Sequence, residues 1–374
     1  MQKRQTADLA ACGEIQKRKE VHAMDVFKLY RNCFNHLRLF VLYWRRIVFA
    51  PNHMKVGFFT KLRANFGGGF LADQWALYSL DGKKKKEYLS EFDWYRSRYI
   101  NEPFDQMLNN KVVATEVLRQ YVRVPEIYLV KTRAGIVDAG HCTKDGTVAV
   151  ETLRQRREAF MKPFGKGKGN GVHRLRYDGQ DFWIDQKKKS AEEMKRMFEK
   201  EGEWYLSETI TQHAYAAGLY DKTCNTIRMI TLRDPDSGKI KLFFAVQRVG
   251  TSKTIPVDNA SQGGLVCKID LETGRLSHAG SLHTTQIYEE HPDSGIRFDQ
   301  VVIPDWEQTK AEIVGLAESL PFLHFVAWDV VKMEDGTNCI IEANTSSGVN
   351  IIQLWGGQRN GELGNFYRRY GAIR

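Results

Sequence analysis

Two acidic residues and an asparagine near the C-terminus have the types and spacing of a magnesium site. They are Asp329, Glu342 and Asn344, which lie in two apolar runs separated by Asp335-Gly336. An Asp-Gly pair between such runs predicts a β-hairpin. A turn centred on this pair places Asp329 opposite Glu342, and Asn344 shares a strand face with Glu342 because side chains alternate along a strand.

Two carboxylates that face each other on a sheet repel unless a cation lies between them. Mg²⁺ would supply that cation, because it binds one or two carboxylates and completes its shell with phosphate and water. A surface hairpin with two solvated acids is the alternative. The flanking run from Phe325 to Val331 is apolar and favours a buried strand, where unpaired acids are costly.

A glycine-rich segment that follows Lys162 could cover a phosphate. Its glycines and lysines are Gly165, Lys166, Gly167, Lys168, Gly169 and Gly171. Such a loop can fold closely over a ligand and direct backbone N–H groups at an anion. It matches neither the Walker nor the dinucleotide-binding pattern. We therefore interpret it as a phosphate lid, while a plain flexible turn fits the same residues.

Two arginines are candidates for contact with a phosphoryl group, which a planar guanidinium can stabilise. Arg228 lies in an alternating, strand-like stretch, and Arg248 is followed by a polar turn that contains Asn259. Each arginine taken alone could equally be a structural ion-pair partner. Glu208 ends another short strand, just before a predicted hinge at residues 211–213.

The chain has 374 residues, 42% hydrophobic and 27% charged, so it can bury a large core. Helices are expected at 108–120, 191–201 and 305–319, a strand at 126–131, and mostly short strands with Gly-containing turns thereafter. Residues 52–105 read as aromatic-rich and irregular. The pattern predicts an α+β fold, with a helical front and mixed antiparallel sheets with interspersed helices.

The longest apolar run, Leu39 to Trp44, is too short to cross a bilayer, and the polar start resembles no signal peptide. We therefore expect a cytoplasmic protein. Its six cysteines form no C-x-x-C pair, which argues against a zinc ribbon or a disulfide framework.

The positive charge is concentrated at the front of the chain. Residues 1–63 contain 13 Lys/Arg against 4 Asp/Glu, and the remainder contains 42 against 41. This balance favours an enzyme body with a cationic docking element over a nucleic-acid-binding protein. Membrane lipid, an acidic glycan or an acidic protein could be its partner.

Residues 21–50 have an amphipathic helical pattern that Pro51 ends, with an apolar stripe beside a row of cations. The stripe is Phe27, Tyr30, Phe34, Leu37, Val41, Trp44 and Val48, and the cations are Lys28, Arg31, Arg38 and Arg45. This pattern suits an anionic membrane surface. A helix packed on its own domain or in a dimer is the alternative.

Together these segments resemble the ATP-grasp superfamily, in this order: Lys111 at a helix start, Lys162 with the glycine-rich loop, Glu208, Arg228 in N-T-I-R-M, then Asp329, Glu342 and Asn344. Residues 208–213, 225–228, 258–264 and 327–344 are most similar to its sugar-transfer-associated branch. That branch is related to α-L-glutamate ligases and is found with cell-surface polysaccharide biosynthesis. The resemblance covers roughly residues 60–374.

The resemblance implies an ATP-grasp fold in which two α+β subdomains clamp ATP. We expect a helical basic region at 1–105 and an ATP-grasp domain at 106–374, divided into a lid-bearing part at about 125–209 and a metal-binding core at 210–374. Lys111, Lys162 and the lid would hold the phosphates, and Glu208 with the backbone near Ile210 the adenine and ribose. Two Mg²⁺ ions would lie on Asp329, Glu342 and Asn344. Arg228, Arg248 and Asn259 would be catalytic.

The implied reaction is ATP-dependent ligation of a carboxylate to an amine through an acyl phosphate. The expected acceptor is a carboxylated (uronic acid) cell-surface glycan precursor, which receives an amino acid or another amine. A kinase of the same fold that phosphorylates a hydroxyl is one alternative. A non-catalytic protein that docks on a membrane or glycan is the other.

Overall fold

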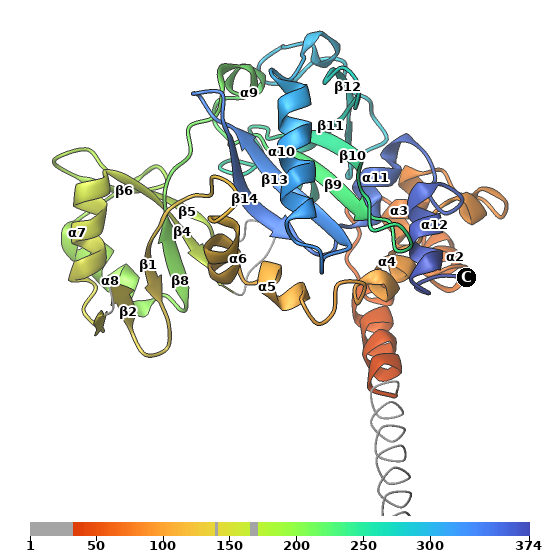
Figure 1. Ribbon diagram of the computed structural model, residues 1–374, viewed down its shortest axis with the longest axis horizontal. Coiled ribbons are helices and arrows are strands. Elements are labelled where there is room, and N and C mark those ends of the chain that lie inside the picture. The colour runs from red at the N-terminus through yellow and green to blue at the C-terminus, as the bar shows by residue number, and fades with distance from the viewer. Residues whose placement is uncertain (1–32, 139–140, 165–170) are drawn as a thin grey trace, which may run out of the picture.

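The structure is a computed structural model that describes residues 33–138, 141–164 and 171–374. They form two antiparallel sheets with helices packed on them, and a further group of helices at one end (Figure 1). The predicted α+β class is confirmed. The division of the chain at residues 105 and 209 stays a prediction.

An eight-stranded sheet lies on the left of Figure 1, in the order β3-β2-β1-β8-β4-β5-β6-β7. Its strands are β1 (Ile127–Lys131), β2 (Ile136–Asp138), β3 (His141–Thr143), β4 (Glu158–Pro163), β5 (His173–Tyr177), β6 (Phe182–Ile184), β7 (Lys187–Lys189) and β8 (Trp204–Ser207). Helices α7 (Thr147–Arg156) and α8 (Ala191–Lys200) share one buried apolar core with this sheet. In the sequence, the glycine-rich segment lies between β4 and β5.

A six-stranded sheet forms the centre, in the order β12-β11-β10-β9-β13-β14. Its strands are β9 (Ile227–Arg233), β10 (Ile240–Val249), β11 (Leu265–Ile269), β12 (Leu276–Ser281), β13 (Phe325–Lys332) and β14 (Asn338–Asn344). All eight residues of β13 are buried, as its continuous apolar run predicts. Trp328 packs in the core beneath α10 (Trp306–Glu318), whereas Phe325 packs in the core of the opposite face.

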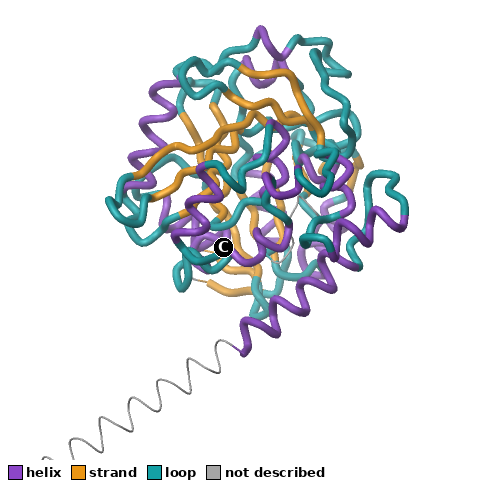
Figure 2. The backbone as a smooth tube through the Cα atoms, turned by 90° about the vertical axis from the view of Figure 1, so that its right-hand side faces the viewer, coloured by secondary structure: helices purple, strands orange, loops and turns teal. Residues whose placement is uncertain are grey.

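Helices from both ends of the described chain cover that opposite face (Figures 1 and 2), namely α4 (Glu91–Ser97), α11 (Val349–Ile352) and α12 (Glu362–Arg369). Helices α2 (Phe58–Phe66) and α3 (Ala72–Leu77) share a separate small core. Leu108 of α5 (Asp105–Asn109) packs in the core on the α10 face. Gln353 joins the two ends of the described chain, because its side-chain amide accepts from Leu89 N at 2.7 Å and donates to Leu89 O at 2.9 Å. Asn101 likewise donates to the carbonyl of Phe325 on β13 at 2.6 Å.

Two remaining helices flank the sheets, α6 (Lys111–Leu118) and α9 (Ala214–Leu219). Short turns complete the list, namely the π-helical turn Trp44–Val48 and the 3₁₀ turns Lys84–Glu87, Ala260–Gln262, Phe298–Gln300 and Gln353–Trp355. Of the predicted helix at 21–50, residues 33–43 are helical and run into the π-helical turn, and residues 21–32 lie outside the described part. Among the described residues, no helix is both long and apolar enough to cross a bilayer.

The prediction of an irregular segment at 52–105 is wrong, because α2, α3 and α4 form there. Each is shorter than the window over which helical periodicity is recognisable. Ser90 starts α4 with a capping box to Asp93. The predicted helix at 108–120 is interrupted at Asn110, whose side chain accepts from Val112 N and starts α6 at Lys111. The helices predicted at 191–201 and 305–319 and the strand at 126–131 are confirmed.

Trp328 should be a principal source of folding stability, because its side chain is fully buried and its indole N–H donates to Thr231 Oγ1 at 3.0 Å. We expect Trp328→Ala to lower the free energy of unfolding by about 3–5 kcal/mol. Urea denaturation measures this loss. Ile287→Ala, at a side chain that is 62% exposed, is the matched control, and equal losses in both variants would contradict the packing described.

Candidate active site

The hairpin of β13 and β14 places Asp329 opposite Glu342, as predicted, but its turn and its register differ from the prediction. The turn closes between Met333 and Thr337, so Val330 lies opposite Ile340. That register alone would bring Ile341 opposite Asp329. The register shifts between Val330 and Asp329, so that Ile341 has no partner on β13. A β-bulge has this effect, and it places Glu342 opposite Asp329.

Asp329 is buried between two arginines. β9 pairs with the other side of β13 and places Arg228 opposite Asp329. Arg228 donates from Nη2 to Asp329 Oδ2 at 2.9 Å and from Nε to Oδ1, and Arg248 Nη1 donates to Oδ2 at 3.1 Å. Burial alone would raise the pKa of Asp329, but the two guanidinium groups hold it below its usual value.

Asp258 completes this charge cluster, and sequence reasoning missed it as a site residue. It accepts from Arg248 Nη2, and from the backbone N–H and hydroxyl of Thr226 at 2.7 and 2.5 Å. Burial acts to lower the pKa of Arg248, but the Asp258 and Asp329 carboxylates outweigh it and raise that pKa. The cluster therefore contains two cations and two anions, all largely buried. The one feature of the sequence that indicated Asp258 was its position at the start of the polar turn 258–264.

Glu342 has a different partner, Lys111, whose Nζ lies 3.5 Å from Glu342 Oε2. Each of the two facing acids therefore has a cationic partner within the chain itself, so their pairing alone does not require a metal ion. The magnesium site on Asp329, Glu342 and Asn344 stays a prediction. Among the described residues, no three His, Cys, Asp or Glu side chains are grouped to hold a metal. A magnesium site here would need the amide oxygen of Asn344 and ligand oxygens as well.

A cavity of about 390 Å³ brings most of the predicted site residues together, with walls from both sheets. Those that line it are Lys111, Lys162, Glu208, Ile210, Arg228, Arg248, Asn259, Asp329, Glu342 and Asn344. Gly171 is described, with a left-handed φ of 76°, and is not part of this wall. The other predicted lid residues, Gly165, Lys166, Gly167, Lys168 and Gly169, lie outside the described residues.

Lys162 reaches this cavity from β4 and has an unusual environment. Its Nζ lies 5.7 Å from the centre of the Phe160 ring and 5.9 Å from that of Tyr205. Burial, and then the charge of Lys111, lower its pKa to about 8, against the weaker opposing effect of Glu342. Lys162 is therefore a cation that an incoming anion would stabilise.

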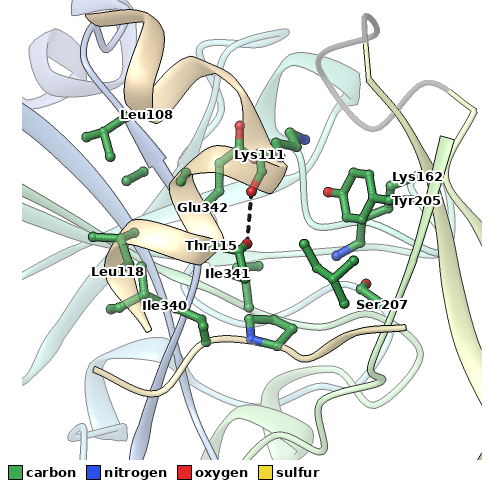
Figure 3. A pocket seen from close by; sticks show the side chains of 15 residues that line it. Leu108, Lys111, Thr115, Leu118, Lys162, Tyr205, Ser207, Ile340, Ile341 and Glu342 are labelled. Atoms are coloured by element: carbon green, nitrogen blue, oxygen red, sulfur yellow. Dashed lines mark hydrogen bonds and ion pairs between the residues drawn. The ribbon is translucent and has the colours of Figure 1, made fainter. Parts of the chain in front are cut away.

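A small slot of about 20 Å³ adjoins the cavity and shares Lys111, Lys162 and Tyr205 with it (Figure 3). Leu108, Leu118 and Ile340 form its apolar side. Ser207 lines it too, and the buried Ser207 hydroxyl has no hydrogen-bond partner among the described residues. The slot thus combines apolar walls with an unused polar group.

The side chains of Glu208 and Asn259 both accept hydrogen bonds from neighbouring protein groups. Arg123 Nη2 lies 2.5 Å from both carboxylate oxygens of Glu208, which also accepts from Glu126 N at 3.0 Å. Asn259 Oδ1 accepts from the backbone N–H and hydroxyl of Ser261, both at 3.0 Å, and so holds its turn. Arg123 is a further positioning residue that sequence reasoning missed.

The helical N-terminal region also contributes to the cavity wall, through Glu91 and Trp94 of α4. Glu91 is 7% exposed and accepts from Gln74 Nε2 at 2.9 Å, and Trp94 donates from its indole N–H to Ser346 Oγ at 2.8 Å. No sequence motif indicated these two residues.

The two sheets with a charged cavity between them are those of an ATP-grasp protein. Residues 92–362 match the family described as sugar-transfer associated ATP-grasp. The chain belongs to this family. The resemblance and the ATP-grasp fold inferred from the sequence are thereby confirmed.

The solved structures that resemble the chain are distant. The biotin carboxylase domain of the Hydrogenobacter thermophilus 2-oxoglutarate carboxylase, with MgADP and bicarbonate, has a TM-score of 0.41 at 13% identity and covers 72% of this chain and 46% of its own. An ADP complex of N5-carboxyaminoimidazole ribonucleotide synthetase has 0.39 at 13%, with 65% and 46% covered.

A third structure is the ATP-grasp ligase PsnB with a precursor peptide and AMPPNP, at 0.36 and 14%, with 73% and 60% covered. The chain thus spans about half the length of the solved structures it matches. No curated protein sequence matches it.

The charge cluster should contribute to folding as well as to the cavity. We expect Asp258→Asn to lower the free energy of unfolding by about 3 kcal/mol, because Arg248 loses one of its two buried anions. Urea denaturation of this variant is compared with that of Asp236→Asn, in which an exposed ion pair with Arg369 is lost and little change is expected. Equal stability of the two variants would contradict a buried, mutually dependent cluster.

Proposed function

We propose that this protein is an ATP-dependent carboxylate–amine ligase. The observation that carries the proposal is the cavity of about 390 Å³ where two lysines and two arginines meet the side chains of Asp329, Glu342 and Asn344. Cationic groups suit phosphate oxygens. Membership in the ATP-grasp family supports the same assignment.

The nucleotide would lie in the cavity of about 390 Å³, with its phosphates towards Lys111 and Lys162. Glu208 with the backbone near Ile210 would contact adenine and ribose. The segment of Gly165, Lys166, Gly167, Lys168, Gly169 and Gly171 would close over the phosphates, since it follows Lys162 in the sequence.

The residues present fit Mg²⁺ in part. Glu342 and Asn344 line the cavity, and Glu342 has only one cationic neighbour at 3.5 Å. Asp329 already accepts from two arginines, so it can offer only its remaining lone pairs. When bound, two such ions would neutralise negative charge on the phosphate oxygens.

In the proposed reaction an oxygen of the acceptor carboxylate attacks the γ-phosphorus of ATP, and the bond from that phosphorus to the β,γ-bridging oxygen breaks. ADP leaves and an acyl phosphate remains. Arg228 and Arg248 would stabilise the charge on the phosphoryl oxygens, because Asp258 and Asp329 fix their positions. A neutral amine then attacks the acyl carbon, loses a proton and displaces phosphate, while closure excludes water. Asn259 would help to orient the reacting groups.

We propose a carboxylated glycan precursor, such as a uronic acid, as the acceptor and an amino acid or another amine as the second substrate. The family description, sugar-transfer associated, supports a sugar substrate. We place the enzyme in the cytoplasm, where polysaccharide precursors and ATP meet, with peripheral contact at the inner face of the membrane through residues 21–50.

A ligase should form ADP only when both a carboxylate and an amine are present. A coupled assay across panels of uronic acids and amines measures this dependence, with mass spectrometry of the amide product. A kinase would form ADP with a hydroxyl acceptor alone and leave a stable phosphorylated product. A docking protein would form no ADP under any combination.

Glu342 should be essential to that activity, since it is the carboxylate of the cavity least engaged by other side chains. We expect Glu342→Ala to lower kcat by at least about a hundredfold, which corresponds to about 2.7 kcal/mol of transition-state stabilisation. Glu334→Ala, at an exposed acid in the same hairpin, is the matched control. Full activity of the Glu342 variant would exclude the proposed site.

Lys162 should make nucleotide affinity depend on pH. With its pKa near 8 in the free protein, the lysine loses its charge as the pH rises through that value, so ADP affinity should fall about tenfold between about pH 7 and 9. Calorimetric titration without metal measures it. Lys162→Arg keeps its charge over this range and should give a flat profile, so an unchanged slope in this variant would assign the effect to another group.

A further inference from the structure

We propose that residues 34–66 form a surface that binds an anionic lipid bilayer. This surface, called the aromatic face below, combines the helix that ends at Val48 with the loop after it and with α2. It extends beyond the helical stripe that the sequence indicates, because α2 supplies four of its ten exposed apolar side chains. The inference is independent of the proposed ligase activity.

The aromatic face exposes more large apolar side chains than a short segment normally would. From the first helix and its end they are Phe34 (56% exposed), Leu37 (61%), Phe40 (61%), Val41 (51%), Trp44 (36%) and Phe49 (73%). From α2 they are Phe58 (69%), Phe59 (83%), Leu62 (36%) and Phe66 (58%). These ten are the majority of the exposed large apolar residues in the described part of the chain.

The two helices are fixed to each other, so their exposed side chains form one continuous surface. Tyr43 donates from its hydroxyl to the Asn65 carbonyl at 2.7 Å, and the Trp44 ring packs against the Phe66 ring with centres 6.2 Å apart. Lys61 Nζ donates to the Ala50 carbonyl at 3.1 Å.

The same helices already have an inner face that packs on the protein. Ile47 and Ala64 are buried, and the Tyr43 ring contacts Phe92 of α4 edge-on at 5.3 Å. The predicted alternative, in which the apolar stripe is buried on its own domain, therefore fails for Leu37, Val41 and Trp44. These side chains remain available for a partner.

The positive charge of this segment indicates an anionic partner for the aromatic face. Residues 26–72 contain eight Lys and Arg and no Asp or Glu. Arg45, Arg46, Lys55 and Arg63, all within residues 34–66, are exposed. Cations beside Trp and Phe suit the boundary between anionic headgroups and acyl chains. A twofold dimer through the same face would instead bring like charges together, since each patch would meet its own copy.

Such binding would also place the active site close to the lipid. Phe92, which Tyr43 contacts, lies in α4 between Glu91 and Trp94, and both of these line the cavity. Helix α4 therefore contacts the helix of the aromatic face and also lines that end of the cavity. In Figure 1 the N-terminal helix leads away from the body beside α4, and Figure 2 shows it at the rim of the molecule.

The test is sedimentation of the full chain with vesicles of phosphatidylcholine alone or with one third phosphatidylglycerol. We expect binding to the anionic vesicles that weakens with added salt. The double variant Phe58→Ser/Phe59→Ser should bind at least about tenfold more weakly, and so should Arg45→Glu/Arg63→Glu. Ile287→Ser/Ile296→Ser, at exposed apolar residues elsewhere, should bind as the parent chain does.

Nucleotide binding and thermal melting, measured on every variant, separate a lost surface from a lost fold and should be unchanged. Equal binding to neutral and anionic vesicles, or an unchanged affinity in the Phe58/Phe59 variant, overturns the proposal. A concentration-dependent dimer without lipid, abolished by the Phe58/Phe59 change and accompanied by no vesicle binding, would assign the face to a second copy and also overturn it.

Discussion

The mutual neutralisation of Arg228, Arg248, Asp258 and Asp329 is the constraint on which the site depends. None of these charges could be buried alone, because desolvation of a single ion costs several kcal/mol. Together they hold two guanidinium groups at the wall of a cavity, with Arg248 Nε lacking a hydrogen-bond partner among the described residues. The balance leaves the arginines fixed and charged, so an anionic ligand meets donors that need no rearrangement.

The strand order explains why this cluster can form. β9 lies between β10 and β13, so Arg228 has Asp329 on one neighbouring strand and Val246 on the other. Arg248 reaches the cluster from the end of β10, and Asp258 from the turn that follows it. Residues separated by up to 101 positions thus meet within hydrogen-bond distance. Such a contact is a property of sheet topology, which a single sequence does not reveal.

The family was inferred because the order of motifs resembles it. The α+β class and the main helices could be predicted because they depend on composition and local periodicity. The hairpin shows the limit. Its facing pair was predicted from a two-residue turn, whereas the structure has a longer turn and an irregularity that skips Ile341. The longer turn and the irregularity shift the pairing in opposite directions, so Asp329 still faces Glu342. Helices α2, α3 and α4 escaped prediction because they are short. Glu91 and Trp94 of α4 reach the cavity through tertiary packing, which no local pattern indicates.

The N-terminal helices show why charge and hydropathy must be judged against packing. Seen in the sequence alone, the apolar stripe of residues 27–48 fits a buried helix as well as a membrane surface. In the structure Ile47 is buried while Trp44 and Val41 are exposed. The helix therefore has two apolar faces, one buried against the protein and one exposed. The buried face packs the helix against α4, whereas the basic, exposed face does not contribute to the packed core. Because α4 also lines the cavity, the packing that stabilises this helix connects the exposed aromatic face to the cavity wall.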